Sequence, residues 1–187
     1  MVRKIWGRSD TILFIFAGAA AEFALSKAVD WLYFTGKLPA DPIGRLFSTV
    51  SYARTIIFTN ESSAFAAIDK MNHIHGAVEK ARGAQIPGWA YRDVLYMLIC
   101  YSVSAFELLE RRLTDEEKEE VFSVFKRVGE RMAIKELPDD YTAWQQQRTK
   151  HLEENLLRSR FTDDLFAQYK KQLGAARYFI LREVQSL

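Results

Sequence analysis

Apolar residues recur at helical spacing through almost the whole sequence, and no stretch alternates apolar and polar residues as a strand does. Capping residues, prolines and glycines divide this pattern into segments. Asp41 followed by Pro42, for example, places a capping carboxylate before a proline at the first helical position. The pattern predicts an all-α fold. We expect helices over residues 9–34, 43–58, 61–82, 90–112, 114–132 and 141–158, and a C-terminal helical region kinked near Gly174. Residues 36–39 are expected to end the first helix.

The chain has 187 residues, a length that suits one domain, and no repeat, low-complexity tract or long linker divides it. We therefore expect residues 1–187 to form a single helical bundle of about seven or eight helices. One cysteine excludes a disulfide scaffold, and one cysteine with three histidines cannot supply a closed structural zinc site. The net charge of +2 is too balanced to indicate a nucleic-acid partner.

Two apolar runs, residues 11–21 and 94–106, are shorter than the roughly 20 residues that a membrane-spanning helix needs. Each run stops at a glutamate, so we expect two buried core helices, the second of them at the centre of the fold. A cleaved signal peptide is not expected, because apolar residues continue at helical spacing past Glu22. The expected location is cytoplasmic, with peripheral membrane contact through the N-terminal apolar helix as an alternative.

The third expected helix carries a histidine, His75, on its apolar face. The stripe to which His75 belongs also contains Ile68, Met71 and Val78. A buried imidazole needs a partner for its ring nitrogens. That partner is either a backbone carbonyl or carboxylate on a facing helix, or the iron of a haem for which His75 is the single axial ligand. His73 lies on the polar side and cannot chelate the same metal, because side chains two positions apart on a helix diverge.

The second expected helix carries a polar stripe that begins with Arg45 and Thr49 and continues with Tyr52. One interpretation is an amphipathic edge whose arginine lies in water. The other directs the guanidinium and the hydroxyl into a cavity, where they could bind a carboxylate or polarise dioxygen. The third histidine, His151, has charged neighbours in the sequence and is expected in solvent.

Several short motifs follow one another in a fixed order. Residues 41–49 read DPIGRLFST and residues 74–78 read IHGAV; residues 93–96, 106–107, 113–117 and 131–138 continue the series. These segments resemble the "DP-x-x-R-L-x-x-T" and "V/I-H-x-x-V" motifs of the MpaB/rubber-oxygenase family, which includes latex-clearing rubber oxygenases and fungal endoplasmic-reticulum oxygenases. The likeness covers about residues 6–141, three quarters of the chain.

The resemblance implies a haem-b oxygenase with a globin-like helical core. His75 matches the histidine of the motif and would be the proximal iron ligand, whereas Arg45 and Thr49 match positions near the distal pocket. Rubber oxygenases have a lysine at the position of Ser48, so rubber cleavage is not the expected activity. The nearest candidates for the family's distal base are Glu22 and Asp30, and Glu107 of the central helix is a further candidate partner.

We therefore expect a haem-dependent oxygenase that uses dioxygen on a small apolar substrate, with His75 on the iron and with Arg45 and Thr49 as its catalytic residues. The alternative is a non-enzymatic helical module that binds an apolar ligand or another protein. In that case a ring nitrogen of His75 forms a hydrogen bond with a backbone carbonyl or a carboxylate of the protein.

Overall fold

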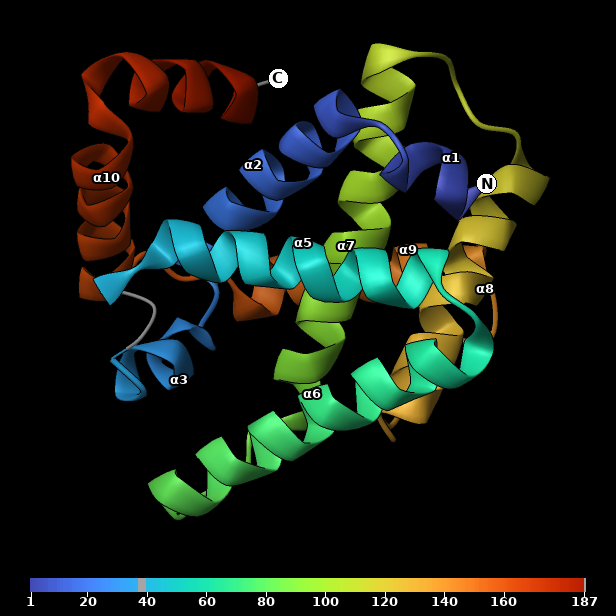
Figure 1. Cartoon of the computed structure of the whole chain (residues 1–187), viewed down its shortest axis with the longest axis horizontal. Helices are drawn as coiled ribbons and strands as arrows, with labels where there is room; N and C mark the ends of the chain where they lie inside the picture. The colour runs from blue at the N-terminus through green and yellow to red at the C-terminus, as the bar shows by residue number, and fades with distance from the viewer. Residues whose placement is uncertain (37–39, 187) are drawn as a thin grey trace.

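The computed structural model describes residues 1–36 and 40–186, and this part of the chain folds as a single all-α domain without strands, as predicted. Residues 37–39, where the end of the first helix was expected, lie outside the described part. The described helices are α1 (Val2–Trp6), α2 (Ser9–Leu25), α3 (Val29–Phe34), α5 (Pro42–Phe58), α6 (Glu61–Arg82), α7 (Gly88–Leu109), α8 (Asp115–Arg131), α9 (Tyr141–Asn155) and α10 (Arg160–Gln185), shown in Figure 1.

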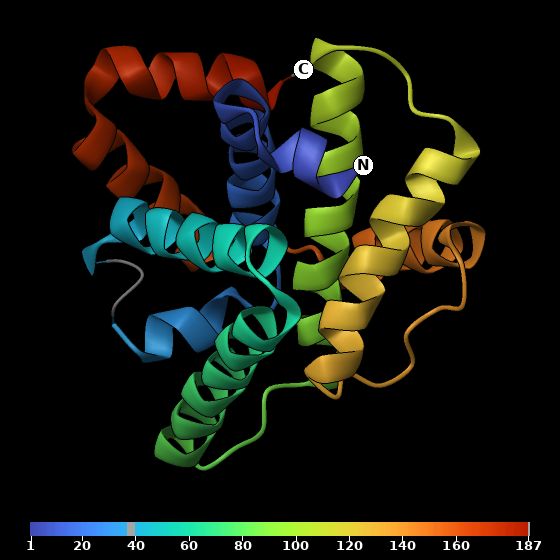
Figure 2. The ribbon, with the colours of Figure 1, turned by 45° about the vertical axis from the view of Figure 1, so that its right-hand side comes forward.

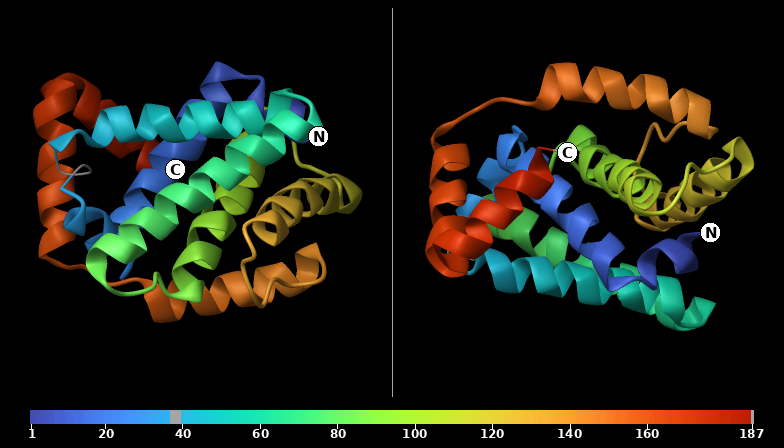
Figure 3. Two further views of the ribbon diagram at one scale, coloured as in Figure 1. Left: turned by 60° about the horizontal axis from the view of Figure 1, so that its bottom comes forward. Right: turned by 90° about the horizontal axis from the view of Figure 1, so that it is seen from above.

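Helix α7 lies at the centre of the bundle, as its apolar sequence predicted (Figures 1 and 2). Helix α2 packs along one side of α7, and α8 and α9 pack against the other. The core between them is built from large buried side chains of α1, α2, α7, α8 and α9, among them Trp6, Phe16, Tyr96, Phe122 and Trp144. Helices α5 and α6 form an antiparallel pair across one face, and α10 bends around the far side of α2 (Figure 3).

Local capping signals account for most helix ends. Asp41 accepts a hydrogen bond from the Gly44 amide at 2.8 Å and starts α5, and Thr114 forms a capping box with Glu117 at the start of α8. Gly83 ends α6 in the left-handed conformation that glycine adopts most readily, with φ 68°. The expected kink of the C-terminal helix is confirmed at Gly174, where φ is 74°.

The first expected helix, residues 9–34, is broken into α2 and α3 because its backbone pairs with another segment at Ser26. The Lys27 amide donates to the Asn155 carbonyl at 2.9 Å, and the Leu157 amide donates to the Leu25 carbonyl at 2.7 Å. A continuous helix over residues 9–34 would have used the Lys27 amide and the Leu25 carbonyl in its own hydrogen bonds. The same pairing ends α9 at Asn155 instead of residue 158.

The short helix α1 was not predicted, although its apolar residues recur at helical spacing. Val2, Ile5 and Trp6 are buried at helical spacing, and the Trp6 indole donates to the Ser102 hydroxyl of α7 at 3.0 Å. The amino group of Met1 forms an ion pair with Glu120 of α8. Among the described helices, none has the length and apolar composition required to cross a bilayer.

Helices α2 and α7 approach closely at Gly18, which predicts that this position tolerates no larger residue. A Cβ atom added to Gly18 would overlap the ring of Tyr101, whose hydroxyl is held by Glu22 at 2.9 Å. We expect Gly18→Ala to lower the free energy of unfolding by about 1–3 kcal/mol through overpacking. Gly76→Ala is the matched control, because nothing lies within 4 Å of its Cβ position; it should stabilise α6 by up to about 1 kcal/mol. Urea denaturation measures both, and equal effects of the two variants would contradict the prediction.

Candidate functional site

His75 lies on the side of α6 that faces the start of α7. Its ring contacts the ring of Tyr91 edge-on, with ring centres 5.2 Å apart. The Tyr91 hydroxyl donates to Glu79 at 3.2 Å, and the same carboxylate oxygen accepts the Ile86 amide at 2.9 Å. Glu79, one turn beyond His75, therefore connects the end of α6 to the loop before α7 and to the first turn of α7. These bonds hold the Tyr91 ring against the imidazole.

The Nδ1 atom of His75 is buried and has no hydrogen-bond partner among the described residues. Burial lowers the pKa of His75 below its ordinary value; the negative charge of Glu79 opposes this shift and the positive charge of Arg45 adds to it. The ring is therefore neutral at pH 7, which is the form that binds metals. An orphaned buried nitrogen costs free energy, so this atom is available for a ligand outside the chain.

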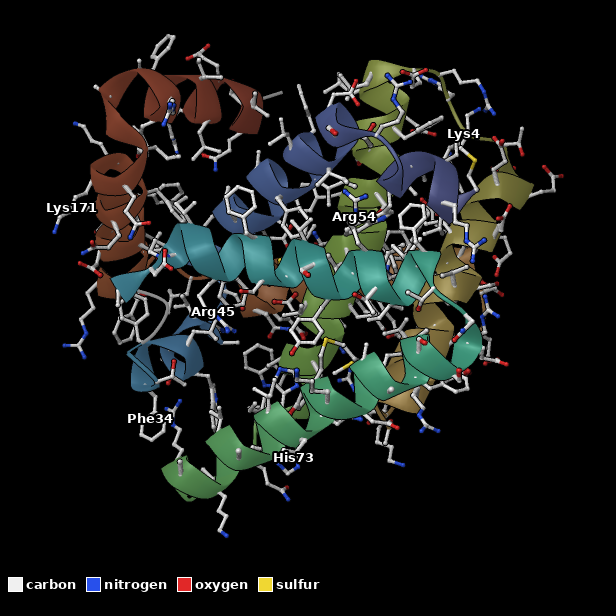
Figure 4. The ribbon with its side chains drawn as sticks, viewed as in Figure 1. Lys4, Phe34, Arg45, Arg54, His73 and Lys171 are labelled. Carbon is white, nitrogen blue, oxygen red and sulfur yellow. The ribbon has the colours of Figure 1, made fainter. Side chains whose placement is uncertain are left out.

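Arg45 and Thr49 occupy the first turns of α5, next to α6. Arg45 is exposed, and its charge reaches His75. Figure 4 shows Arg45 at the start of α5, on the side nearer α3 and α6, and shows His73 on the outer side of α6. Thr49 is exposed, and its hydroxyl donates to the Arg45 carbonyl at 3.1 Å. Arg45 thus acts on His75 through its charge, whereas the Thr49 hydroxyl is engaged with its own helix.

The three acidic candidates lie in different parts of the fold. Glu107 accepts the Leu113 amide at 3.0 Å near the end of α7, about 24 Å along the helix axis from Tyr91 and hence far from His75. Glu22 is buried in a separate polar cluster. Asp30 alone is held against α6, because it pairs with Arg82 at 2.7 Å in the last turn of that helix.

Sequence reasoning missed a polar cluster buried between α2, α7 and α9. Its central ion pair joins Arg148 to both carboxylate oxygens of Glu22; Nη1 donates to Oε1 at 2.6 Å, and Nη2 donates to Oε2. Asp93 lies 4.0 Å from the guanidinium and accepts the Ser26 hydroxyl at 3.1 Å. The side chains of these ionic groups are at most 6% exposed. They connect three helices through charges that water does not screen.

His151 belongs to this cluster, so the expectation that it lies in solvent is wrong. Its Nδ1 is 3.7 Å from Asp93 and 2.9 Å from the Asn155 amide, and its ring contacts Tyr96 edge-on. The charged neighbours of His151 in the sequence point elsewhere, because only one face of α9 meets the core. The spacing of Arg148 and His151, which are three positions apart, indicates that both side chains lie on that face.

The described residues offer no site for a bare metal ion, since no three of their His, Cys, Asp or Glu side chains converge. A haem iron requires only one protein ligand. The neutral imidazole and unpartnered nitrogen of His75 fit that requirement, and the Arg45 cation nearby fits the carboxylates that a haem carries.

A comparison with family models decides the family. The model described as "ER-bound oxygenase mpaB/B'/Rubber oxygenase, catalytic domain" matches residues 4–182. The chain belongs to this family. The match confirms the resemblance of residues 6–141 and extends it through α9 and most of α10. Comparisons with curated proteins and with solved structures gave no significant match.

Members of the mpaB/rubber-oxygenase family are oxygenases by description, and the motif histidine and arginine of this member lie on neighbouring helices, α6 and α5. The matched region also contains the buried cluster of Glu22, Asp93 and Arg148, which belongs to its helical framework.

The lowered pKa of His75 predicts a pH dependence of stability. As pH falls through about 6.5, the His75 imidazole binds a proton in the unfolded state but stays unprotonated in the folded state. The free energy of unfolding therefore decreases. Replacement by His75→Gln should remove this part of the acid destabilisation, measured by urea denaturation of cofactor-free protein between pH 7.5 and about pH 5. His73→Gln, at an exposed position of the same helix, is the control. A His75→Gln profile parallel to that of the unmodified protein would refute the prediction.

The buried ion pair predicts a large loss of stability in Arg148→Met. This change leaves the Glu22 carboxylate buried without its cation, which should cost about 3–5 kcal/mol. Arg158→Met breaks a surface pair with Asp163 and should cost less than about 1 kcal/mol. The double variant Glu22→Gln/Arg148→Met should recover part of the loss, because it removes the stranded charge. Similar costs for the two arginine variants would contradict the role assigned to the cluster.

Proposed function

We propose that the protein is a haem-b-dependent oxygenase that acts on a small apolar substrate, with His75 as the proximal iron ligand. The half-buried imidazole of His75, whose buried Nδ1 atom has no hydrogen-bond partner among the described residues, is the observation that carries this proposal. Membership of an oxygenase family supplies the class of reaction. The globin-like core implied by the resemblance is part of the same proposal.

A bound haem would supply the iron that activates dioxygen. His75 would hold the iron, and Tyr91 would keep the imidazole in its orientation through the edge-on ring contact. Arg45 would bind a haem carboxylate or the dioxygen substrate, since its positive charge acts on His75. Thr49 would become a donor to the distal side only after its hydroxyl leaves the Arg45 carbonyl.

Rubber cleavage remains outside this proposal. Ser48 occupies the position of the rubber oxygenases' lysine, and its hydroxyl donates to the Gly44 carbonyl of its own helix at 3.0 Å. A serine in this state offers no amine for the distal side of a haem. We therefore propose a different apolar substrate.

A non-enzymatic module that binds an apolar ligand is the second candidate. One observation favours it, namely that Arg45 and Thr49, the two expected catalytic side chains, are both exposed. In this case the protein would keep the helical fold of the family but would not catalyse an oxygenase reaction.

Titration of the cofactor-free protein with haemin tests the proposed ligand. We expect the Soret band of haemin to shift and sharpen until one equivalent is bound, and binding at least about tenfold weaker in His75→Ala, because the iron loses its protein ligand. His73→Ala should bind haem like the unmodified protein, since His73 lies on the outer side of α6. An unchanged haemin spectrum in the presence of the unmodified protein, or the same spectrum in His75→Ala, would overturn the proposal and leave the binding module.

A further inference from the structure

Arg82 lies at the end of α6, on the same stripe of that helix as His75. The two residues are seven positions apart, which is two turns and about 10 Å along the helix axis. The other members of the stripe are apolar, namely Ile68, Met71 and Val78. An arginine on such a stripe brings five N–H donors to a side of the helix that offers few acceptors.

Helix α3 provides partners for part of this guanidinium. Nη2 of Arg82 donates to Asp30 at 2.7 Å. The guanidinium also lies over two aromatic rings, 3.9 Å from the ring centre of Trp31 and 5.4 Å from that of Phe34. Figure 4 shows Phe34 between α3 and the end of α6. Arg82 therefore connects α3 to the end of α6.

One end of the guanidinium is left without an acceptor. The Nη1 atom of Arg82 is buried and has no hydrogen-bond partner among the described residues, although the side chain as a whole is 26% exposed. The nearest carboxylate on α6, that of Glu79, accepts the Tyr91 hydroxyl and the Ile86 amide instead. A buried donor of a charged group costs free energy while it is unpaired. A carboxylate from outside the chain would remove this cost, because it is a strong acceptor for a guanidinium.

Two buried nitrogen atoms without partners thus lie on one stripe of α6, in His75 and in Arg82. A haem has a group for each of them, an iron for the imidazole and carboxylates for the guanidinium. Haem b carries two carboxylates on one edge of its ring. Arg45 of α5, on the side nearer α3 and α6, supplies the second cation. The chain therefore offers one arginine from each of two neighbouring helices for the two carboxylates.

We propose that Nη1 of Arg82 binds a carboxylate of the haem and directs that edge of the ring toward α3. This inference rests on the proposed function, because it requires a haem held by His75. The same guanidinium contacts Asp30 and Trp31, so a bound haem also stabilises α3 against local opening. Arg82 is then a cofactor-binding residue as well as the contact between α3 and α6.

Titration with haemin and with haemin dimethyl ester, whose carboxylates carry no charge, tests this contact. The ester should bind the unmodified protein more weakly than haemin does. We expect Arg82→Met to weaken haemin binding about tenfold or more, equivalent to at least 1.4 kcal/mol, and to leave ester binding unchanged. Lys80→Met removes an exposed cation of the same helix and should alter neither affinity. Unchanged haemin binding in Arg82→Met, or equal weakening of haemin and ester, would overturn the inference.

Two further variants separate carboxylate binding from the contact with α3. Asp30→Asn loses the ion pair but keeps the guanidinium, so it should bind haemin at least as tightly as the unmodified protein does. A loss as large as that in Arg82→Met would show that only the ion pair matters and would contradict the proposal. Arg82→Gln replaces Arg82→Met if thermal denaturation shows that the latter does not fold. It should likewise weaken the binding of haemin and not that of the ester.

Amide hydrogen exchange of Val29–Phe34 supplies a readout that does not depend on affinity. Saturating haemin should slow exchange in α3 of the unmodified protein but not of Arg82→Met. Equal protection of α3 in both proteins would contradict the link between the haem and α3.

The two proposals fail in different ways. A protein that does not bind haemin, or that binds it equally well in His75→Ala, overturns the proposed function and this inference with it. A protein that binds haemin through His75 but prefers haemin over the ester by the same factor in Arg82→Met overturns only the carboxylate contact.

Discussion

The arrangement of the helices depends on one buried cation, Arg148, and the two carboxylates that surround it. Glu22 on α2 and Asp93 on α7 are both buried, and a buried carboxylate costs free energy unless a cation or hydrogen-bond donor lies next to it. Burial on its own would lower the pKa of Arg148, but the hydrogen bonds and charge of Glu22 outweigh it and raise the pKa. Burial also raises the pKa of the Tyr101 hydroxyl, which therefore stays protonated and donates to Glu22.

This cluster determines where the neighbouring helices end. The Ser26 hydroxyl donates to Asp93 at the point where α2 ends, and residues 25–27 pair there with residues 155–157 at the end of α9. The position of α9 follows from these contacts, since Arg148 and His151 both point from it into the core. Helix α7, held from both sides, then presents Tyr91 at its start to His75 of α6.

The helical class, the central helix and most helix starts were predictable because their causes are local. Asp41, Asn60 and Thr114 each cap a helix by accepting a hydrogen bond from the amide three positions later. The break at Ser26 was not predictable, since it depends on an exchange of backbone hydrogen bonds with residues about 130 positions later in the chain. Burial of His151 escaped prediction for the same reason, because the residues that cover it, Asp93 and Tyr96, come from α7.

The candidate site was predictable only in part. Helical periodicity placed His75 on the inner face of α6, and the family motif selected it together with Arg45. The unpartnered Nδ1 and the contact with Tyr91 require the packing of α6 against α7, which no local pattern contains. Glu107 lies on a buried helix, as expected, but near the end of α7, whereas His75 contacts its start. Periodicity predicts which face of a helix a residue occupies, but not how far along the helix it lies from a site.

The central claim, that the His75 imidazole holds the iron, is tested most directly by resonance Raman spectroscopy of the ferrous haem complex. The account predicts an iron–histidine stretching band in the unmodified protein, its loss in His75→Gly, and its return when free imidazole fills the space left by the side chain. An identical band in His75→Gly without imidazole would assign the iron to another residue and contradict the account.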